Sequence, residues 1–414
     1  MFLLRELADF TSNFVFFYPF IMSLFWMAGA VLFFVYRERE EEICFDDYDW
    51  PMVSFLVPCF NEEDTIEETI RYLSKMPYPK KEIIAVNDGS TDQTAKILYK
   101  LAEQIKELRF IDCKENCGKA NSLHIACHAA RAEYLICIDA DAILDPNAPF
   151  YLIHHFFKNG ERVGAVTGNP RVRNRKTLLS KLQIVEYASI IGSIKRTQRI
   201  LGKVMTVSGV VVAFRKKALA DVGLWDRDMI TEDIAVSWKL QRRFWDIRYE
   251  PRALCWMLVP ETLKGIWKQR IRWAQGGEEV LIRHWRVFCD WRQRRIWIVY
   301  LEQLCSILWT FSWLALTVFK QIISVTLTEH LMWFTLSSFV LVLMSFVQLL
   351  TSVIIDSKHD SVKRYLAWSA WYPALYWIVS TMVVIFALPR AIRARIKGGY
   401  ALWSSPDRGM DKTV

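Results

Sequence analysis

Two carboxylates, Asp139 and Asp141, come directly after a short apolar run in the segment YLICIDADAILD, residues 134–145. The run at 134–138 has the length and composition of a buried strand in a parallel sheet. In open α/β sheets, ligands bind at the carboxyl ends of the strands, where these two acids are placed. Two hard oxygen donors at this spacing suit Mg²⁺ or Mn²⁺, especially an ion that also contacts substrate phosphates. A turn or a helix cap uses aspartate in the same way, so this stretch alone leaves both interpretations open.

Three more polar positions follow predicted strands and could contact a nucleotide. Glu62 comes after the first strand, in PCFNE, and Asp88 comes after the second, in NDGST. A carboxylate at a strand end can accept hydrogen bonds from a base or ribose. Lys119 opens the helix after the third strand, where its ammonium can meet a phosphate. An ordinary turn or helix start explains each position equally well when it is taken alone.

The segment Thr231-Glu232-Asp233 precedes an amphipathic helix, IAVSWKLQRRF. Acids in the first turn of a helix are ordinary capping residues. The functional hypothesis makes Asp233 a general base that takes the proton of an acceptor hydroxyl as the transition state develops.

A further motif, QRIRW, places Gln269, Arg272 and Trp273 within about one helical turn, so that they share a face. Arginine suits phosphate charge, and tryptophan offers a flat surface to a sugar ring. A helix lying at a membrane interface is the alternative.

Strands that alternate with helices are predicted to position these residues. Apolar runs indicate strands at 53–58, 82–87, 109–112 and 134–138, with helices at about 62–75, 93–105 and 119–131. This order is typical of βαβ units and predicts an α/β fold with a doubly wound, mostly parallel sheet. The period continues at 163–168, after which the pattern becomes more helical.

The composition also indicates a membrane component, because 53% of the 414 residues are hydrophobic and 14% are aromatic. After a lead at 1–14, residues 15–36 carry no charge and are long enough to span a bilayer. The lead mixes basic and acidic residues and lacks the pattern of a signal peptide, which favours a retained anchor. Further spans are predicted at 298–325, 331–355 and 366–388, and a basic tail follows at 389–414.

The distribution of basic residues predicts which parts of the chain lie in the cytoplasm, but the predictions for the domain and for the C-terminus conflict. Arg37 and Arg39 favour a cytoplasmic position for the domain at 37–262, and the nine scattered cysteines suit a reducing compartment. Three later spans would then leave the C-terminus outside. Four basic residues favour the inside: Arg390, Arg393, Arg395 and Lys397. Either one segment is re-entrant, with Pro373 a candidate break, or the tail departs from the charge rule.

Between the sheet and the later spans, residues 263–297 combine five tryptophans with many lysines and arginines. This composition predicts amphipathic helices that lie in the headgroup region of a membrane. They account for much of the net charge of +9. Because no nucleic-acid recognition module accompanies the charge, we expect no nucleic-acid partner.

The order of these motifs resembles the processive family 2 glycosyltransferases, which include cellulose, chitin and hyaluronan synthases. The acid after the second strand, the Asp-x-Asp, the Thr-Glu-Asp, the Gln-x-x-Arg-Trp and the spans follow one another as in that family. The resemblance covers nearly the whole chain. It is strongest to members that make the bacterial biofilm polymer poly-β-1,6-N-acetyl-D-glucosamine, in the segments NDGST (87–91), VTGNPR (166–171), MITEDI (229–234), EPRALCW (250–256), PETLKGIW (260–267) and RWAQGG (272–277).

The resemblance implies a GT-A type sheet and an inverting, processive enzyme. It would polymerise N-acetylglucosamine from UDP-N-acetylglucosamine and translocate the growing glycan. On the donor side, the resemblance implies uridine contacts for Glu62 and Asp88, a phosphate contact for Lys119, and nucleotide and metal binding for Asp139 and Asp141. On the acceptor side, it implies acceptor binding by Ser208 and Gly209 and catalysis by Asp233, next to the substrate-binding Glu232. It also implies that the diphosphate and the acceptor end are held by Gln269, Arg272 and Trp273.

The resemblance further implies a multi-pass protein of the bacterial inner membrane with a cytoplasmic catalytic domain. It also implies a small membrane partner subunit and regulation of the pair by cyclic di-GMP. The residues by themselves do not separate a pocket for N-acetylglucosamine from one for glucose. Another β-polysaccharide synthase, of hyaluronan, chitin or cellulose type, remains an alternative, as does a transferase that adds one sugar to a lipid carrier. A catalytically idle scaffold that binds a nucleotide is an alternative from another class.

Overall fold

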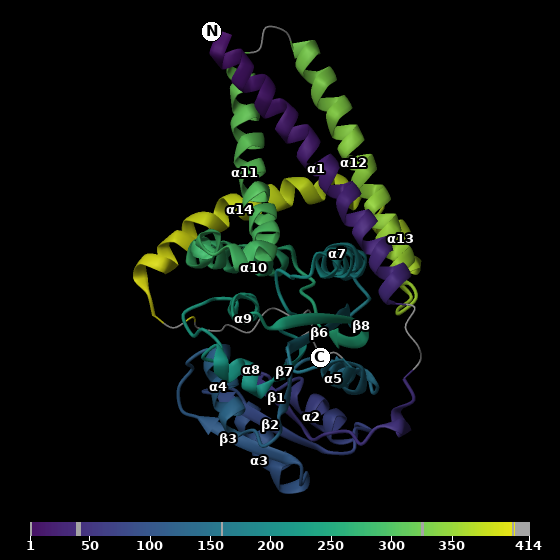
Figure 1. The fold of residues 1–414 in the computed structure, drawn as a ribbon, viewed down its shortest axis with the longest axis vertical. Coiled ribbons are helices and arrows are strands. Elements are labelled where there is room, and N and C mark those ends of the chain that lie inside the picture. Colours follow the sequence, from purple (N-terminus) through teal and green to yellow (C-terminus); the bar gives the residue numbers. More distant parts are fainter. Residues whose placement is uncertain (1, 39–42, 159, 324–326, 400, 402–414) are drawn as a thin grey trace.

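An eight-stranded sheet organises one half of the molecule, and long helices rise from it (Figure 1). The computed structural model describes residues 2–38, 43–158, 160–323, 327–399 and 401. We call residues 43–262 the sheet domain. Its strands run in the order β3-β2-β1-β4-β7-β6-β8-β5.

The first half of the sheet matches the sequence prediction. Its strands are β1 (Val53–Cys59), β2 (Lys81–Asp88), β3 (Leu108–Cys113) and β4 (Tyr134–Ile138). All neighbours among them pair in parallel. The connecting helices are α2 (Ile66–Ser74), α3 (Thr94–Gln104) and α4 (Lys119–Ala129). Strands β1 and β4 are buried along their whole length, as expected for apolar runs covered by helices on both faces.

The second half of the sheet departs from the prediction. It contains β5 (Ile143–Leu144), β6 (Val163–Val172), β7 (Val211–Arg215) and β8 (Asp246–Met257). Three antiparallel pairs, β4 with β7, β6 with β7 and β5 with β8, make the sheet mixed. The expectation of mainly helical structure after residue 168 is wrong for β7 and β8, because these strands are defined by long-range pairing and not by local periodicity.

Helices of the second half pack around these strands. They are α5 (Ala148–Lys158), α6 (Leu178–Glu186), α7 (Ile194–Leu201), α8 (Lys216–Asp221) and α9 (Glu232–Arg242). A π-helical segment, η2 (Tyr187–Ser193), joins α6 to α7.

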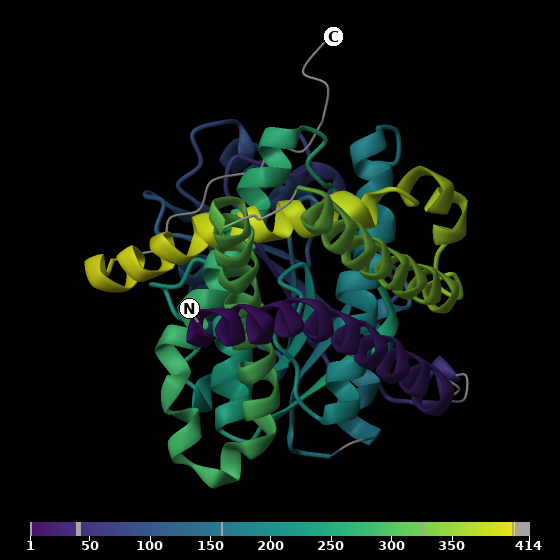
Figure 2. The same ribbon diagram turned by 90° about the horizontal axis from the view of Figure 1, so that it is seen from above.

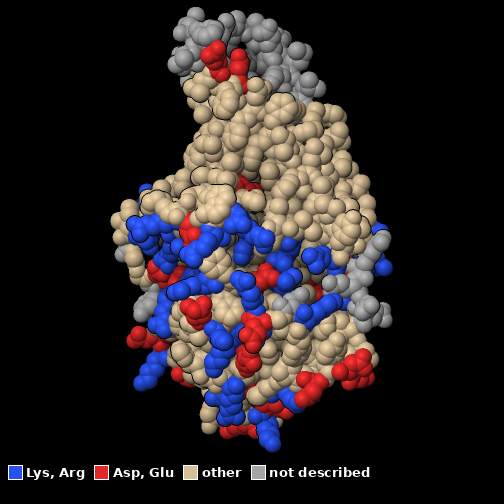
Figure 3. All heavy atoms as spheres, in the orientation of Figure 1, with Lys and Arg blue, Asp and Glu red and all other residues tan. Residues whose placement is uncertain are grey.

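Three long helices form what we call the helical column: α1 (Phe2–Arg37), α11 (Arg294–Ile323) and α12 (Leu327–Asp356). By length and composition, four stretches of the described residues could cross a membrane: Glu6–Arg37, Trp291–Phe319, Ser338–Asp356 and Leu375–Ile396. The first three belong to the column. In Figure 3 the column is almost free of charge, and basic side chains gather directly below it.

The fourth stretch lies in α14 (Tyr372–Lys397), which is oriented differently from the column. Figures 1 and 2 show α14 running crosswise at the base of the column, above α10 (Leu263–His284). Val383 and Ala387 of α14 pack against Ile271 of α10. This helix contains most of the span predicted at 366–388.

Both ends of α14 meet the sheet domain. Before it, η5 (Val362–Tyr365) and α13 (Leu366–Ser369) pack against the buried cluster that includes Ile184 of α6. After it, the amide of Ala401 donates to the carbonyl of Arg227 at 2.9 Å. The chain that follows α14 therefore lies beside the sheet domain.

A buried ion-pair network fastens the column to the sheet domain. Arg196 of α7 is fully buried and bonds both Glu38, just past α1, and Asp356, at the end of α12. Arg171 of β6 bonds the same Asp356 at 2.6 Å. Two helices of the column are thus fixed to the same point of the sheet domain.

Candidate active site

The predicted Asp-x-Asp lies at the carboxyl end of β4, and Lys119 connects it to the Thr-Glu-Asp segment. The Lys119 ammonium donates to Asp139 Oδ1 at 2.6 Å and lies 3.1 Å from Glu232 Oε1. The pKa of Lys119 is raised because the attraction of these carboxylates outweighs the effect of burial. One lysine therefore joins two motifs that are more than ninety residues apart in the sequence.

Asp141 is a buried carboxyl whose ionised form is disfavoured by its surroundings. Its side chain is buried, and burial raises its pKa to about 7, with the neighbouring charge of Asp139 adding to the effect. A divalent cation would relieve this, and two carboxylates with phosphate oxygens are the usual donor set for Mg²⁺. The described residues contain no cluster of three or more metal-ligating side chains, so further ligands would come from the substrate or water. The pair therefore fits Mg²⁺ or Mn²⁺ held against a diphosphate.

Asp88 and Glu62 also lie at this edge, and both are buried. Asp88 accepts from the amides of Cys117 at 3.1 Å and Gly118 at 2.8 Å. Gly118 has a φ of 91°, which favours glycine, and it directly precedes Lys119. Glu62 accepts from the hydroxyl of Thr65 at 3.0 Å. Asp88 thus fixes the loop that presents Lys119, while the uridine contacts of both acids remain predictions.

Asp233 lies against the Ser208–Gly209 loop, as the resemblance implies. The amide of Gly209 donates to Asp233 Oδ2 at 3.2 Å, and the amide of Ile234 donates to Oδ1 at 2.9 Å. Burial, followed by the charge of Glu232, raises the pKa of Asp233 to about 6, against the opposing charges of Lys119 and Arg272. Such a carboxylate is ionised at neutral pH and is more basic than an exposed aspartate, which suits a general base.

Helix α10 brings the Gln-x-x-Arg-Trp motif next to the Thr-Glu-Asp segment. A Cβ at Gly276 would lie only 1.9 Å from Thr231 Oγ1, so the two segments touch through a position without a side chain. Gln269 is buried, and its Oε1 has no hydrogen-bond partner among the described residues. The ring of Trp273 lies 6.2 Å from that of Tyr187, whereas Arg272 is exposed. A substrate could satisfy the Gln269 oxygen and meet the Arg272 charge.

Two residues that the sequence did not single out lie beside the Ser208–Gly209 loop. Thr167 Oγ1 accepts from the amide of Ser208 at 2.8 Å and from the Lys195 ammonium at 3.3 Å. Burial lowers the pKa of Lys195 to about 7. Thr167 belongs to VTGNPR, one of the segments that carry the family resemblance. Lys195 lies in an ordinary basic helix, and nothing local marks it.

A cavity of about 200 Å³ lies between the column and α14. Aromatic and polar side chains line it, including Tyr18, Trp26, Trp309, Gln348 and Tyr376. Its floor includes Glu186, which accepts from Arg270 of α10 at 2.7 Å. The cavity therefore begins beside the helix that carries the Gln-x-x-Arg-Trp motif.

Comparison with known proteins places this geometry in a family. Residues 51–276 match the model described as glycosyltransferase like family 2. The chain is 45% identical over 407 residues to a poly-beta-1,6-N-acetyl-D-glucosamine synthase of Staphylococcus epidermidis, covering 96% of this chain and 98% of that protein. It is 46% identical over 409 residues to the enzyme of the same name from Staphylococcus aureus, with the same coverage.

A solved structure supports the fold independently. A mannosyltransferase from Pyrobaculum calidifontis, determined with GDP-Man and Mn²⁺, superposes with a TM-score of 0.65 at 18% identity, over 94% of this chain and 99% of that one. This similarity shows the fold, which is GT-A. Together with the family match, it establishes that this chain belongs to the family 2 glycosyltransferases and is a glycosyl-transferring enzyme.

Proposed function

We propose that this protein polymerises N-acetylglucosamine from UDP-N-acetylglucosamine into poly-β-1,6-N-acetyl-D-glucosamine for a biofilm matrix. Full-length identity of 45% to synthases of that polymer supports the product. The observation that carries the chemistry is the placement of Asp233, which contacts the Ser208–Gly209 loop and is linked through Glu232 and Lys119 to Asp139.

The reaction follows from this arrangement. Asp233 accepts the proton of the acceptor 6-hydroxyl while the oxygen attacks C1 of the donor sugar. The bond from C1 to the diphosphate breaks on the opposite face, UDP leaves, and the configuration inverts. Lys119 and Arg272 bind the negative charge that develops on the diphosphate. A divalent ion held by Asp139 and Asp141, when bound, adds electrostatic stabilisation of that leaving group.

Gln269 and Trp273 would hold the acceptor end, and the cavity between the column and α14 would receive the growing glycan. Tryptophan and tyrosine rings offer stacking surfaces to sugar rings, and the polar groups of Glu302 and Gln348 offer hydrogen bonds. Polar side chains inside a helical column are costly unless they line a functional path. These features support translocation through this region.

The basic residues below the column support a position in the bacterial inner membrane with the sheet domain in the cytoplasm. In this proposal α1, α11 and α12 cross the bilayer, and α10 and α14 lie at its cytoplasmic surface. The catalytic domain comprises residues 37–262, and the interface segment comprises 263–297.

A small membrane partner and control of the pair by cyclic di-GMP are a further part of the proposal, supported by the family resemblance. Synthesis measured with and without cyclic di-GMP, in membranes of the native host and in membranes containing this chain alone, tests both points. A response in native membranes that is lost when the chain is alone is the expected result. Equal rates of synthesis in all four conditions would contradict both the membrane partner and the control by cyclic di-GMP.

Product analysis tests the proposed function. Membranes containing the protein should convert labelled UDP-N-acetylglucosamine into a large, water-soluble polymer that a β-1,6-specific glycosidase degrades. A single labelled sugar that extracts into organic solvent would identify a lipid-carrier transferase instead. A polymer with other linkages, or one made only from UDP-glucose, would identify another type of β-polysaccharide synthase.

A further inference from the structure

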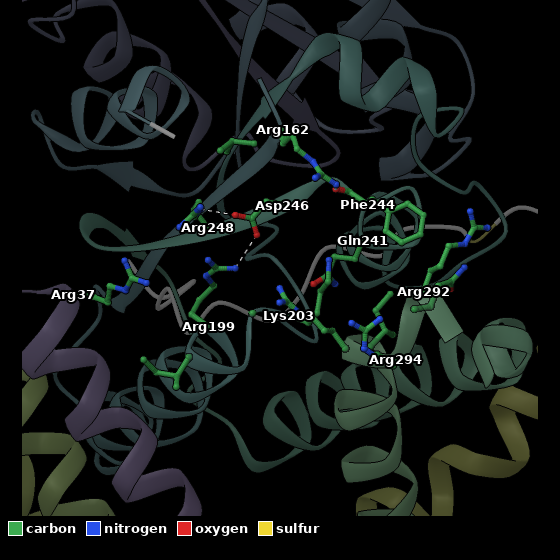
Figure 4. Close-up of a pocket in the computed structure, with 16 residues that line it drawn as sticks. Arg37, Arg162, Arg199, Lys203, Gln241, Phe244, Asp246, Arg248, Arg292 and Arg294 are labelled. Carbon is green, nitrogen blue, oxygen red and sulfur yellow. Dashed lines mark hydrogen bonds and ion pairs between the residues drawn. The ribbon is translucent and has the colours of Figure 1, made fainter. Parts of the chain in front are cut away.

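A second, larger cavity lies apart from the active site and is strongly basic (Figure 4). Its volume is about 830 Å³, within the range of small-molecule sites. It is bounded by the ends of α1 and α7, the starts of β6 and β8, and the start of α11. Strand β6 runs parallel to β4 in the sheet, so this cavity lies at the opposite end of the strands from Asp139.

Charge in this cavity is unbalanced among the described residues. Eight lysine and arginine residues line it, but Asp246 is the only acid. Arg199 donates to Asp246 Oδ1 at 2.9 Å, and Arg248 lies 2.6 Å from Oδ2, so the one carboxylate is already shared. Neither Lys203 nor Arg295 forms an ion pair with any described acid.

The remaining cations are crowded together. Arg295 lies next to Gly202, with its Nη1 3.8 Å from a Cβ built at that position, and Lys203 follows directly. Burial lowers the pKa of Lys203 to about 8, and nearby arginines add to the effect although Asp246 opposes it. Lys203 is half-buried and Arg295 is exposed. Moving the Lys203 charge away from water without a counter-charge is costly, and a bound anion would remove this cost.

The cavity lies where two candidate spans meet the sheet domain. Arg37 is the last residue of one span, Glu6–Arg37, and the other begins at Trp291, next to the lining residue Arg292. This is the level at which phosphate headgroups of a bilayer are found. Arginine and lysine bind phosphate through charge-assisted hydrogen bonds.

We propose that this cavity is a phosphate-binding site that holds the headgroup of an anionic membrane lipid. Arg199 and Arg248, oriented by Asp246, form one wall, and Lys203 and Arg295 supply the charge that the headgroup neutralises. The bound lipid fixes α1 and α11 to the sheet domain. A soluble phosphate compound shares the same chemistry, and the test below separates the two sources.

The experiment uses the full-length protein in neutral detergent and counts bound ligands by native mass spectrometry. The probes are short-chain phosphatidylglycerol, short-chain phosphatidylcholine and inorganic pyrophosphate. We expect phosphatidylglycerol to bind at least tenfold more tightly than phosphatidylcholine. The double variant Lys203→Gln and Arg295→Gln should lose most of this preference, because it removes two of the charges that would contact the headgroup phosphate inside the cavity.

A matched control removes the same charge elsewhere. Lys264→Gln with Arg286→Gln changes two exposed basic residues of the interface segment and should bind phosphatidylglycerol like the unmodified protein. Thermal unfolding gives a second readout, since phosphatidylglycerol should raise the Tm of the unmodified protein and of the control but not that of the cavity variant. The single variant Lys203→Gln serves if the double variant does not fold.

Three results would overturn the lipid assignment. The two lipids could bind equally, or the cavity and control variants could bind phosphatidylglycerol alike. Saturation by pyrophosphate without binding of phosphatidylglycerol would identify the site as one for a soluble phosphate.

Discussion

Asp233 differs from an ordinary helix-capping aspartate in its burial and in its neighbours. Both of its oxygens accept backbone amides, yet burial and Glu232 keep its pKa raised to about 6. The sequence placed it in a capping position and could not separate that role from catalysis. The structure adds a tertiary contact with the amide of Gly209, which is 24 residues earlier in the chain, and this contact supports the proposed catalytic role.

The raised pKa of Asp233 predicts that the rate of the reaction falls at acid pH. Only the ionised carboxylate can accept the acceptor proton, so kcat/KM should be nearly constant above pH 7 and fall about tenfold per pH unit below about 6. The measurement is UDP release between pH 4.5 and 8.5 at saturating divalent metal, which keeps Asp141 ionised. A rate that stays level down to pH 5 would contradict the assignment.

Glu278 of α10 is expected to make the stability of the folded protein depend on pH. It is buried with neither carboxylate oxygen hydrogen-bonded among the described residues, and burial, with Glu279, raises its pKa to about 8. Because the folded pKa lies above the unfolded value, this carboxyl lowers stability increasingly as the pH rises from about 4.5 to 8. Glu278→Gln should therefore be more stable at pH 8 by about 1–3 kcal/mol, with little difference at pH 4.5. Thermal unfolding at the two pH values tests this, and a variant that is less stable at pH 8 would contradict it.

Among the elements, α10 packs most directly against the segment that carries Asp233. Its Gly276 touches Thr231, directly before Glu232 and Asp233. Gly276→Ala would force α10 away from this segment and should lower kcat at least tenfold, while the protein stays folded.

The neighbouring glycine is a matched control for that change. A Cβ at Gly277 would lie 3.6 Å from Met205 Cε, an ordinary van der Waals contact. Gly277→Ala should therefore keep nearly full activity in the same UDP-release assay. Equal activity of the two variants would show that close packing at Gly276 does not matter.

The sequence predicts an element well when neighbouring residues determine it, and poorly when distant parts of the chain do. Strands β1 to β4 are apolar runs bounded by turns, so the sequence located them within about two residues. Strands β7 and β8 owe their pairing to partners far along the chain, and local periodicity missed them. Helix α14 is apolar enough for a span, and only its packing on α10 gives its direction.

The candidate site residues also divide into those that local sequence predicts and those that depend on tertiary packing. The motifs named the acids at or just after the ends of β1, β2 and β4 and those that open α9, because strand ends and helix starts are visible in the sequence. The ion pair of Lys119 with Glu232 and the contact of Lys195 with Thr167 depend on tertiary packing, which the sequence does not display.

For the molecule as a whole, the arrangement of the helices supports the proposed membrane topology, which the sequence left open. In the proposed topology, three crossing helices place the N-terminus opposite the sheet domain, and α14 remains on the domain side (Figure 1). In a background with Cys44→Ser and Cys289→Ser, a membrane-impermeant thiol reagent added to spheroplasts should label Asp9→Cys but not Arg395→Cys. Both positions are exposed. Labelling of Arg395→Cys before the membrane is permeabilised would show that α14 crosses.

In the proposed reaction, this enzyme transfers N-acetylglucosamine from a UDP-linked donor with Asp233 as its base. The most direct measurement compares UDP release from UDP-N-acetylglucosamine by membranes that contain equal amounts of the unmodified protein or of Asp233→Asn. We expect at least a hundredfold loss of rate in the variant, with donor binding retained, because Lys119 and the Asp139–Asp141 pair are unchanged. Equal rates, or release of UDP by neither protein in folded form and with its partner present, would contradict the account.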